Sequence, residues 1–474
     1  MKNKPSWLSE FLLTISNIIS FSPNFSGFPE KAFFNIYLPV LILIPQVFTT
    51  NILAPNLSSA QMTIIPIFLV FIFSRLQRWK FSLNDLLVTG YAGACIYSEY
   101  RSGEKYLFLV AQFLCSVIAP YFLAKTLITS SQLDVRFAQR LVFLVFVDVL
   151  IASFEFRFQF NPLITLPAHY FNVQREWYTS YRYGLPRIAE AFAHPILFAI
   201  GISIAFLLNY WLVKNKFWSK NFKHLPSLFL SKGMIIAFVL IIGLILTFSR
   251  GPLLSCIFGT LVIGAGFSKH RLRSLALRAL IAVIFAVMIY YSFHQYLQMG
   301  QKMASDTEQT AIYRINLWNE YLKLIWMQPI WGWGQQVWLR EEIFLVEKHT
   351  FSVDNAYLYL TLLHGFVSTA LFTAVGFWAM LRLAFYGIFQ PLKNVQLSSL
   401  MFALLAVILT ILLSLTTVYM GLQIEPLFFI AIGWAEGVML ANPNKLQNIL
   451  EQQTYVFQPR LAEEYKPVQR SQET

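Results

Sequence analysis

Long apolar runs recur along this chain, and they restrict its fold more than any other feature. They begin near residue 32 and continue to residue 440, and each is close to the roughly 20 mostly apolar residues that a helix needs to cross a bilayer. In the whole sequence 57% of the residues are hydrophobic and 12% are charged, whereas soluble domains carry about 25% charged residues. The sequence therefore predicts an all-α integral membrane protein.

About twelve of these runs have the length of a helix, so we expect about twelve membrane-spanning helices. They lie at about residues 32–50, 60–74, 83–98, 106–128, 139–156, 191–213, 232–249, 251–267, 274–293, 355–381, 397–418 and 423–440. We expect residues 1–440 to form a single polytopic membrane domain and residues 441–474 to form a polar tail.

Alternate connections between the runs are rich in lysine and arginine. The clusters extend from Arg75 to Lys80, from Lys125 to Arg140, from Lys214 to Lys232, from Lys269 to Arg278 and from Arg382 to Lys393. Basic connections stay in the cytoplasm, so we expect both termini there. The outer face then receives two longer loops, residues 157–190 and 294–354, and a tight turn at residues 247–252.

The formal net charge of +13 would suit nucleic acid, anionic lipid or an anionic substrate, and the placement of the charges decides between them. The expected outer segments contain Arg157, Arg175, Arg182, Arg187, Arg250, Arg314 and Arg340. A guanidinium group binds phosphate with two parallel hydrogen bonds and stays charged. This pattern favours a phosphorylated lipid over nucleic acid, although any one outer arginine can also extend to headgroups or pair with a nearby carboxylate, such as Arg175 with Glu176.

The turn Ser249-Arg250-Gly251-Pro252 lies between two apolar runs, with no acidic residue within several positions. A charge in this setting is costly, which makes Arg250 a functional candidate. Glycine and proline allow a sharp turn, and the helix that follows begins with free N–H groups that can face an anion. We expect Arg250 and Ser249 to lie at an anion site.

Two further candidates are Arg187 and His194, which are seven residues apart and share a face if the segment is helical. His194 is a candidate base or hydrogen-bond donor, and the alternative is a histidine packed at a helix entry. Arg314 falls on an expected amphipathic helix of the second loop, where the alternative is an ordinary solvated face.

Asp354, Asn355 and Tyr357 lie at the outer start of a span. A helix cap accounts for one of the first two residues, but not for both together with Tyr357 on the next turn. A carboxylate at Asp354 could accept a proton from an attacking hydroxyl group, and Asn355 could orient the substrate.

Three signatures in this order resemble the O-antigen ligase and polymerase family of bacterial membrane glycosyltransferases. Arg187 to Pro195 resembles the family's Arg-x-x-x-x-Phe-x-His/Asn-Pro motif, and Thr247 to Gly251 resembles its Thr-x-Ser-Arg-Gly turn. Arg314 to Gly334, followed by Asp354 to Leu358 and Gly365, resembles its long loop and the next helix. The resemblance covers about residues 180 to 380.

The resemblance implies a GT-C-like helical fold in the bacterial inner membrane, with the active site on the periplasmic side. It implies a glycan donor on undecaprenyl pyrophosphate, a glycan or lipid acceptor, and inverting transfer without a metal ion, cofactor or nucleotide sugar, in O-antigen, lipopolysaccharide or exopolysaccharide synthesis. By the same resemblance, Arg187 and Arg250 would hold the pyrophosphate, Arg314 would assist them, and the loop of residues 294–354 would cover the acceptor site. We also expect Ser249, Asn355 and Tyr357 to bind substrate.

Family ligases usually have His-Asn where this chain has Asp354-Asn355, and the Asp-Asn form is more similar to the polymerases. We therefore expect a polymerase somewhat more than a ligase. A transporter or flippase of lipid-linked sugars is the alternative from another class. Transporters place ionisable groups near the middle of the membrane, whereas the basic groups of this chain gather at one face, which favours an enzyme.

Overall fold

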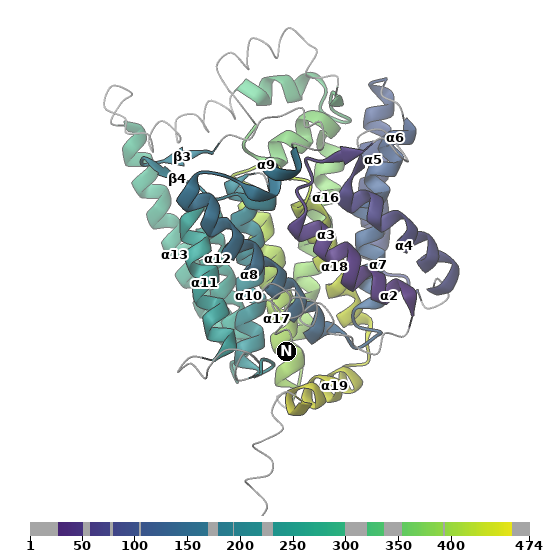
Figure 1. Ribbon diagram of the computed structural model, residues 1–474, viewed down its shortest axis with the longest axis vertical. Coiled ribbons are helices and arrows are strands. Elements are labelled where there is room, and N and C mark those ends of the chain that lie inside the picture. Colours follow the sequence, from purple (N-terminus) through teal and green to yellow (C-terminus); the bar gives the residue numbers. More distant parts are fainter. Residues whose placement is uncertain are drawn as a thin grey trace, which may run out of the picture.

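A computed structural model describes residues 27–50, 57–75, 79–103, 106–168, 179–192, 194–219, 231–298, 320–335, 353–391 and 394–456. Within these ranges the chain is a bundle of helices, with two antiparallel hairpins of two-residue strands. The helices α11, α12 and α13 lie on one side of the bundle and α4, α5 and α6 on the other, with α16, α17 and α18 between them (Figure 1).

The first part of the chain forms short helices and then longer ones. The elements are α2 (Phe28–Ala32), the π-helix η1 (Phe33–Tyr37), α3 (Leu38–Leu43), α4 (Ser59–Arg75), α5 (Leu83–Arg101), α6 (Tyr106–Phe113), the π-helix η3 (Leu114–Ile118), α7 (Ala119–Leu127) and α8 (Asp134–Phe158). The hairpin β1 (Thr49–Thr50) with β2 (Leu57–Ser58) precedes α4. We expected a helix over residues 32–50, but α3 ends at Leu43 because Ile44 precedes Pro45 and takes an extended conformation.

The second part contains the longer apolar helices. The elements are α9 (Pro162–Ala168), β3 (Tyr181–Arg182), β4 (Leu185–Pro186), the 3-10 helix η4 (Glu190–Phe192), α10 (Pro195–Lys214), α11 (Lys232–Leu246), α12 (Arg250–Ala265), α13 (Arg271–Gln298), α16 (Ala356–Phe389), α17 (Val395–Ser414), α18 (Ile424–Leu440) and α19 (Pro443–Val456). The last of these belongs to the segment that we expected to be a polar tail, yet its Leu446 and Leu450 are buried.

Every expected apolar run overlaps a helix or a series of helices, but fewer of them have the length of a membrane span. Among the described residues, four helices are long and apolar enough to cross a membrane: Leu109–Leu127, Pro195–Lys214, Ala356–Phe389 and Val395–Ser414. A fifth is added if α18 and α19, bent by 112°, count as one broken span. The all-α membrane class is confirmed, while twelve spans and a GT-C-like arrangement stay predictions.

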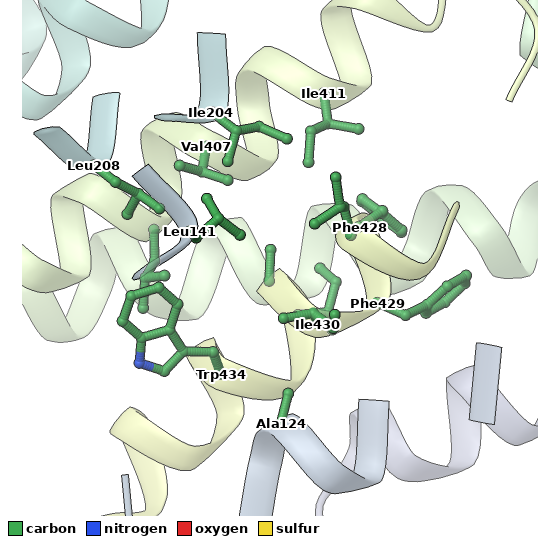
Figure 2. Close-up of a cluster of buried hydrophobic side chains, with 14 of the residues drawn as sticks. Ala124, Leu141, Ile204, Leu208, Val407, Ile411, Phe428, Phe429, Ile430 and Trp434 are labelled. Atoms are coloured by element: carbon green, nitrogen blue, oxygen red, sulfur yellow. The ribbon is translucent and has the colours of Figure 1, made fainter. Parts of the chain in front are cut away.

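The core lies where α8, α10, α17 and α18 meet. Leu141, Ile204, Val407 and Ile411 contribute to it from three of these helices, and Trp434 and Phe428 come from α18 (Figure 2). Burial of a large apolar side chain stabilises a water-soluble core by about 1.5–3 kcal/mol, whereas in lipid, close packing and hydrogen bonds supply more of the stability. Glycines allow such packing, and a Cβ at Gly437 would lie 2.6 Å from the Lys125 carbonyl oxygen of α7.

A break in α16 shapes one end of the bundle. Gly365 has φ 73° and ψ −179°, a conformation that is open essentially only to glycine. The break exposes backbone groups that bond to residues 329–335: Trp333 N–H donates to Leu362 O at 3.0 Å, and Phe366 N–H donates to Pro329 O at 2.8 Å. Residues 320–327, just before this segment, are helical. The end of the expected outer loop is thus held against α16.

A buried ion pair fixes the same junction to α5. Glu99 Oε1 lies 2.8 Å from His364 Nε2, and Glu99 Oε2 accepts the Gln335 N–H at 2.8 Å. Both side chains are buried, and removing one partner from a buried pair would leave an uncompensated charge. Three segments that are distant in sequence are therefore linked through one carboxylate.

Candidate functional site

The turn between α11 and α12 lies at the end of the bundle opposite to α19 (Figure 1). α11 ends at Leu246, Phe248 takes a left-handed conformation with φ 49°, and α12 begins at Arg250. Proline is tolerated in the first turn of a helix because its missing N–H has no partner there, and Pro252 occupies that turn. The sharp turn predicted from Ser249 to Pro252 is present.

Arg187 is anchored to this turn from another part of the chain. Its Nε donates to the Thr247 carbonyl oxygen at 2.8 Å, and its Nη2 donates to Ser249 Oγ at 3.0 Å. The side chain is 8% exposed. The structure thus brings Arg187 and Ser249 into direct contact. From the sequence we expected both residues to bind substrate.

The hairpin β3–β4 adds two residues that the sequence did not single out as site residues. Arg182 Nη1 donates to the Phe248 carbonyl oxygen at 2.6 Å. The Arg250 guanidinium lies 5.7 Å from the centre of the Tyr183 ring, a cation–π distance. Arg182 was noted as an outer arginine, but only the folded hairpin, with positive φ at Tyr183 and Gly184, places it beside Arg187 and Arg250.

Three cations therefore surround the turn, and we call Arg182, Arg187 and Arg250 the arginine cluster. Among the described residues, none of the three forms an ion pair with a carboxylate. Burial, followed by the nearby Arg182 cation, lowers the pKa of Arg187 to about 10. Burial and then Arg250 lower the pKa of Arg182. Arg187 stays charged at neutral pH, and the like charges of the cluster lie close enough to affect one another.

Glu190, three residues after Arg187, does not neutralise the cluster. Its side chain is fully buried, and burial raises its pKa to about 9, with smaller contributions from Asp148 and Glu155 of α8. Glu155 Oε2 accepts the Ala189 and Glu190 N–H groups at 2.8 and 2.9 Å. The Glu190 carboxyl group is therefore protonated at neutral pH and leaves the positive charge of Arg187 uncompensated.

His194 lies at the N-cap of α10. Its Nδ1 accepts the Ile196 N–H at 3.3 Å, and its ring lies 6.0 Å from that of Tyr419. Burial and then Arg187 lower the pKa of His194 to about 4, while Asp354 raises it. The imidazole is therefore neutral at pH 7, with its proton on Nε2. The packed, capping role that we considered is present, and Nε2 can still donate a hydrogen bond.

Asp354 lies within electrostatic range of His194, because its charge affects the histidine pKa. The N-cap of α16 is Asn355, whose Oδ1 accepts the Tyr357 and Leu358 N–H groups at 3.0 Å each. Asp354 is therefore not needed as the cap. Tyr357 donates its hydroxyl proton to the Leu412 carbonyl oxygen at 3.0 Å, so this hydroxyl holds α16 against α17.

The predicted site residues thus fall into three groups. Arg187, Ser249 and Arg250 gather at one turn, with His194 and Asp354 near it. Asn355 and Tyr357 serve α16 itself in this structure. Arg314 lies outside the described residues. Among the described histidine, cysteine, aspartate and glutamate residues, no group of three or more is arranged to hold a metal ion.

Comparison with known proteins gives one family match. A search of the curated proteins finds no match. Residues 235–373 match the family model described as O-antigen ligase, and this segment contains the turn with Ser249 and Arg250 as well as Asp354. Arg187 and His194 precede the matched segment but contact it or influence its charges. The match, together with the order of the motifs, supports an assignment to the O-antigen ligase and polymerase family.

Proposed function

We propose that this protein is a membrane glycosyltransferase that transfers or polymerises glycan repeat units carried on undecaprenyl pyrophosphate. In this proposal it acts at the periplasmic face of the bacterial inner membrane, in O-antigen or exopolysaccharide synthesis. The family match supports a function of the O-antigen ligase type. The observation that carries the rest of the proposal is the arginine cluster, three cations at one turn without a carboxylate partner among the described residues.

The arginine cluster suits a pyrophosphate leaving group. When the acceptor hydroxyl oxygen attacks the anomeric carbon, the bond from that carbon to the phosphate oxygen breaks and its electron pair stays with the pyrophosphate. Cations fixed where this charge develops stabilise the transition state. Arg187 is held by two hydrogen bonds, so it loses little conformational freedom on binding, whereas Arg250 is exposed and available to a ligand. A fixed Arg187 and an exposed Arg250 suit an anion site that is formed before the ligand binds and has one cation that can adjust its position.

The acceptor must lose a proton in the same reaction. We assign its removal to Asp354, which precedes the capping Asn355 and lies within electrostatic range of His194. The neutral His194 can orient a substrate oxygen through Nε2–H. The reaction is inverting in this scheme, because one displacement at the anomeric carbon reverses its configuration, and no metal ion is assigned a part.

Asp354 also favours a polymerase over a ligase. Ligases of the family usually have histidine at this position, and the Asp-Asn pair is more similar to the polymerases. Deleting the gene in its native host and separating the surface polysaccharide on a gel tests this assignment. A polymerase predicts that long chains vanish while a single repeat still reaches the acceptor. Accumulation of full-length glycan on undecaprenyl pyrophosphate would instead identify a ligase.

Arg250→Ala tests the pyrophosphate role most directly. We expect the variant to insert normally and to lose glycan transfer. Arg157→Ala is a matched control, because Arg157 is also exposed and its guanidinium also lies over an aromatic ring, at 5.8 Å from Phe158, but outside the arginine cluster. Full activity of Arg250→Ala, or equal losses in both variants, would overturn the role assigned to Arg250.

A transporter or flippase of lipid-linked sugars is the alternative function, since it also needs an anion site and many apolar helices. The two classes differ in detergent solution, where no second compartment exists. A glycosyltransferase forms new glycosidic bonds when the purified chain is mixed with lipid-linked donor and acceptor. Absence of any product under these conditions, together with movement of the donor across vesicle membranes, would favour the flippase.

A further inference from the structure

A second polar site lies at the opposite end of the bundle from the arginine cluster. It is a cavity of about 360 Å³, lined by residues of α7, α18 and α19 and of the segments beside them. Figure 1 shows α19 at this end of the bundle. The charged side chains on its wall are those of Lys80, Lys125 and Lys445, and no carboxylate is among the described residues that line it. The cavity is therefore a concave cationic site, apart from the region that contains the motifs.

The charge of Lys125 is already compensated. Its Nζ lies 2.5 and 2.7 Å from the two carboxylate oxygens of Asp85 and 3.0 Å from Ser82 Oγ, so its donors are in use. Lys80 and Lys445 are exposed, and neither forms an ion pair with a described carboxylate. Two ammonium groups are thus left to attract an anion into the cavity.

The walls of the cavity are held in place before any ligand binds. Gly437 lets α18 lie close to α7, because a Cβ there would be 2.6 Å from the Lys125 carbonyl oxygen. α19 turns by 112° from α18 and buries Leu446 and Leu450 against the bundle. Lys445 lies in the first turn of α19, where the positive end of the helix dipole adds to its charge.

The lining is also partly apolar. Leu440, Leu446 and Ile449 line the same cavity as the lysines, so an occupant meets cations and hydrocarbon side by side. A free phosphate ion gains nothing from the apolar wall, whereas a phospholipid presents a phosphate next to an acyl chain. Basic pockets at the cytoplasmic ends of membrane helices bind anionic lipid headgroups in this way, and the lysine-rich connections of the sequence predict that this end faces the cytoplasm.

We propose that this cavity binds the phosphate of an anionic phospholipid headgroup between Lys80 and Lys445, with its acyl chains along the apolar wall. The site is independent of the proposed glycan transfer, because the lining residues lie at the opposite end of the bundle. Its occupant fastens α19 to α7 and α18. The phosphate is the shared chemistry of a lipid headgroup and a free anion, and the two sources are separable by experiment.

The experiment measures lipid binding to the purified full-length chain in detergent by native mass spectrometry, with phosphatidylglycerol and phosphatidylcholine as probes. We expect phosphatidylglycerol to bind more tightly. In the double variant Lys80→Gln/Lys445→Gln its affinity falls roughly 30-fold, since each lysine near a lipid headgroup contributes about a factor of five. Lys216→Gln/Lys269→Gln is the matched control, because both lysines are exposed at the same end but do not line the cavity.

Several results would overturn the proposal. Equal binding of the two lipids, or parental affinity in Lys80→Gln/Lys445→Gln, excludes a charge-selective headgroup site at this cavity. If the control variant loses as much affinity for phosphatidylglycerol, the effect comes from the general surface charge and not from this cavity. Inorganic phosphate supplies the other arm: if millimolar phosphate binds alone and displaces the lipid, the occupant is a free anion and the lipid assignment is wrong.

Discussion

Arg187 donates to Ser249 Oγ at 3.0 Å and to the Thr247 carbonyl oxygen at 2.8 Å. These two bonds join the segment before α10 to the turn that carries Arg250, so two motifs that are about sixty residues apart in sequence meet at one turn. A guanidinium group can make both bonds because its donors diverge from a rigid plane. The relationship has consequences that can be measured.

Arg187→Lys should reduce glycan transfer by roughly 100-fold. A lysine keeps the positive charge but cannot reach Thr247 and Ser249 with two separate donors, and a hydrogen bond to a charged group is worth about 1.5–3 kcal/mol. Ser249→Ala removes a single acceptor and should lose less, about 10-fold. The initial rates of both variants with lipid-linked donor give the order. A rate for Arg187→Lys equal to that of the parent would show that charge alone suffices.

Asp354→Asn should slow the chemical step more than it weakens donor binding. The amide keeps the size of the side chain but cannot accept a proton at neutral pH, and general-base catalysis contributes about 100- to 10,000-fold. We expect kcat to decrease by a factor within that range, while KM for the donor changes little. Asn355→Asp is a control variant, because its carboxylate oxygen can still cap α16. Unchanged turnover in Asp354→Asn would assign the proton to another group.

Gly365→Ala should destabilise the protein by at least about 3 kcal/mol. The conformation of Gly365 costs a residue with a Cβ about 1–3 kcal/mol, and the added Cβ would also collide with the Ile330 carbonyl and lie 2.6 Å from Trp331 N. Thermal unfolding in detergent, with proteolysis of residues 329–335, measures the loss. Gly93→Ala is the control, since a Cβ there meets nothing within 4 Å. Equal midpoints for the two variants would contradict a strained break at Gly365.

Much of this architecture could be predicted from the sequence because it depends on local patterns. Apolar runs of helical length mark the helices, and Ser249 to Pro252 indicates a turn without any tertiary information. Arg250 indicates an anion site because a charge between two apolar segments, without an acidic residue nearby in the sequence, is energetically costly. These predictions rest on single segments and on the physics of an apolar surrounding.

The rest depends on contacts between distant segments. Nothing in the local sequence places Arg182 against Phe248, because this hydrogen bond joins two segments that are 66 residues apart. The sequence also does not show which of Asp354 and Asn355 caps α16, since either side chain can cap a helix. Glu99 could not be paired with His364 from sequence, because the two residues are 265 positions apart and meet through the packing of α5 against α16.

Glu190 makes the stability of the protein fall as pH rises. The pKa of its buried carboxyl group is raised from 4.5 to about 9, first by burial. Between these values the unfolded chain has released the proton and the folded chain has not, so folding becomes less favourable with increasing pH. The loss is complete above about pH 9. Asp148 and Glu155 of α8 also raise the pKa of this carboxyl group.

Glu190→Gln should therefore reduce the fall in thermal midpoint between pH 5.5 and 8.5, because an amide does not titrate. The comparison is the difference between the two midpoints for each protein, which cancels any fixed cost of the substitution. Glu320→Gln is the control, since Glu320 is partly exposed and pairs with Lys323 at 3.2 Å on the surface; its difference should equal that of the parent. If the midpoint of Glu190→Gln falls between pH 5.5 and 8.5 by as much as that of the parent protein, Glu190 is already ionised in the folded state. Its charge would then compensate Arg187.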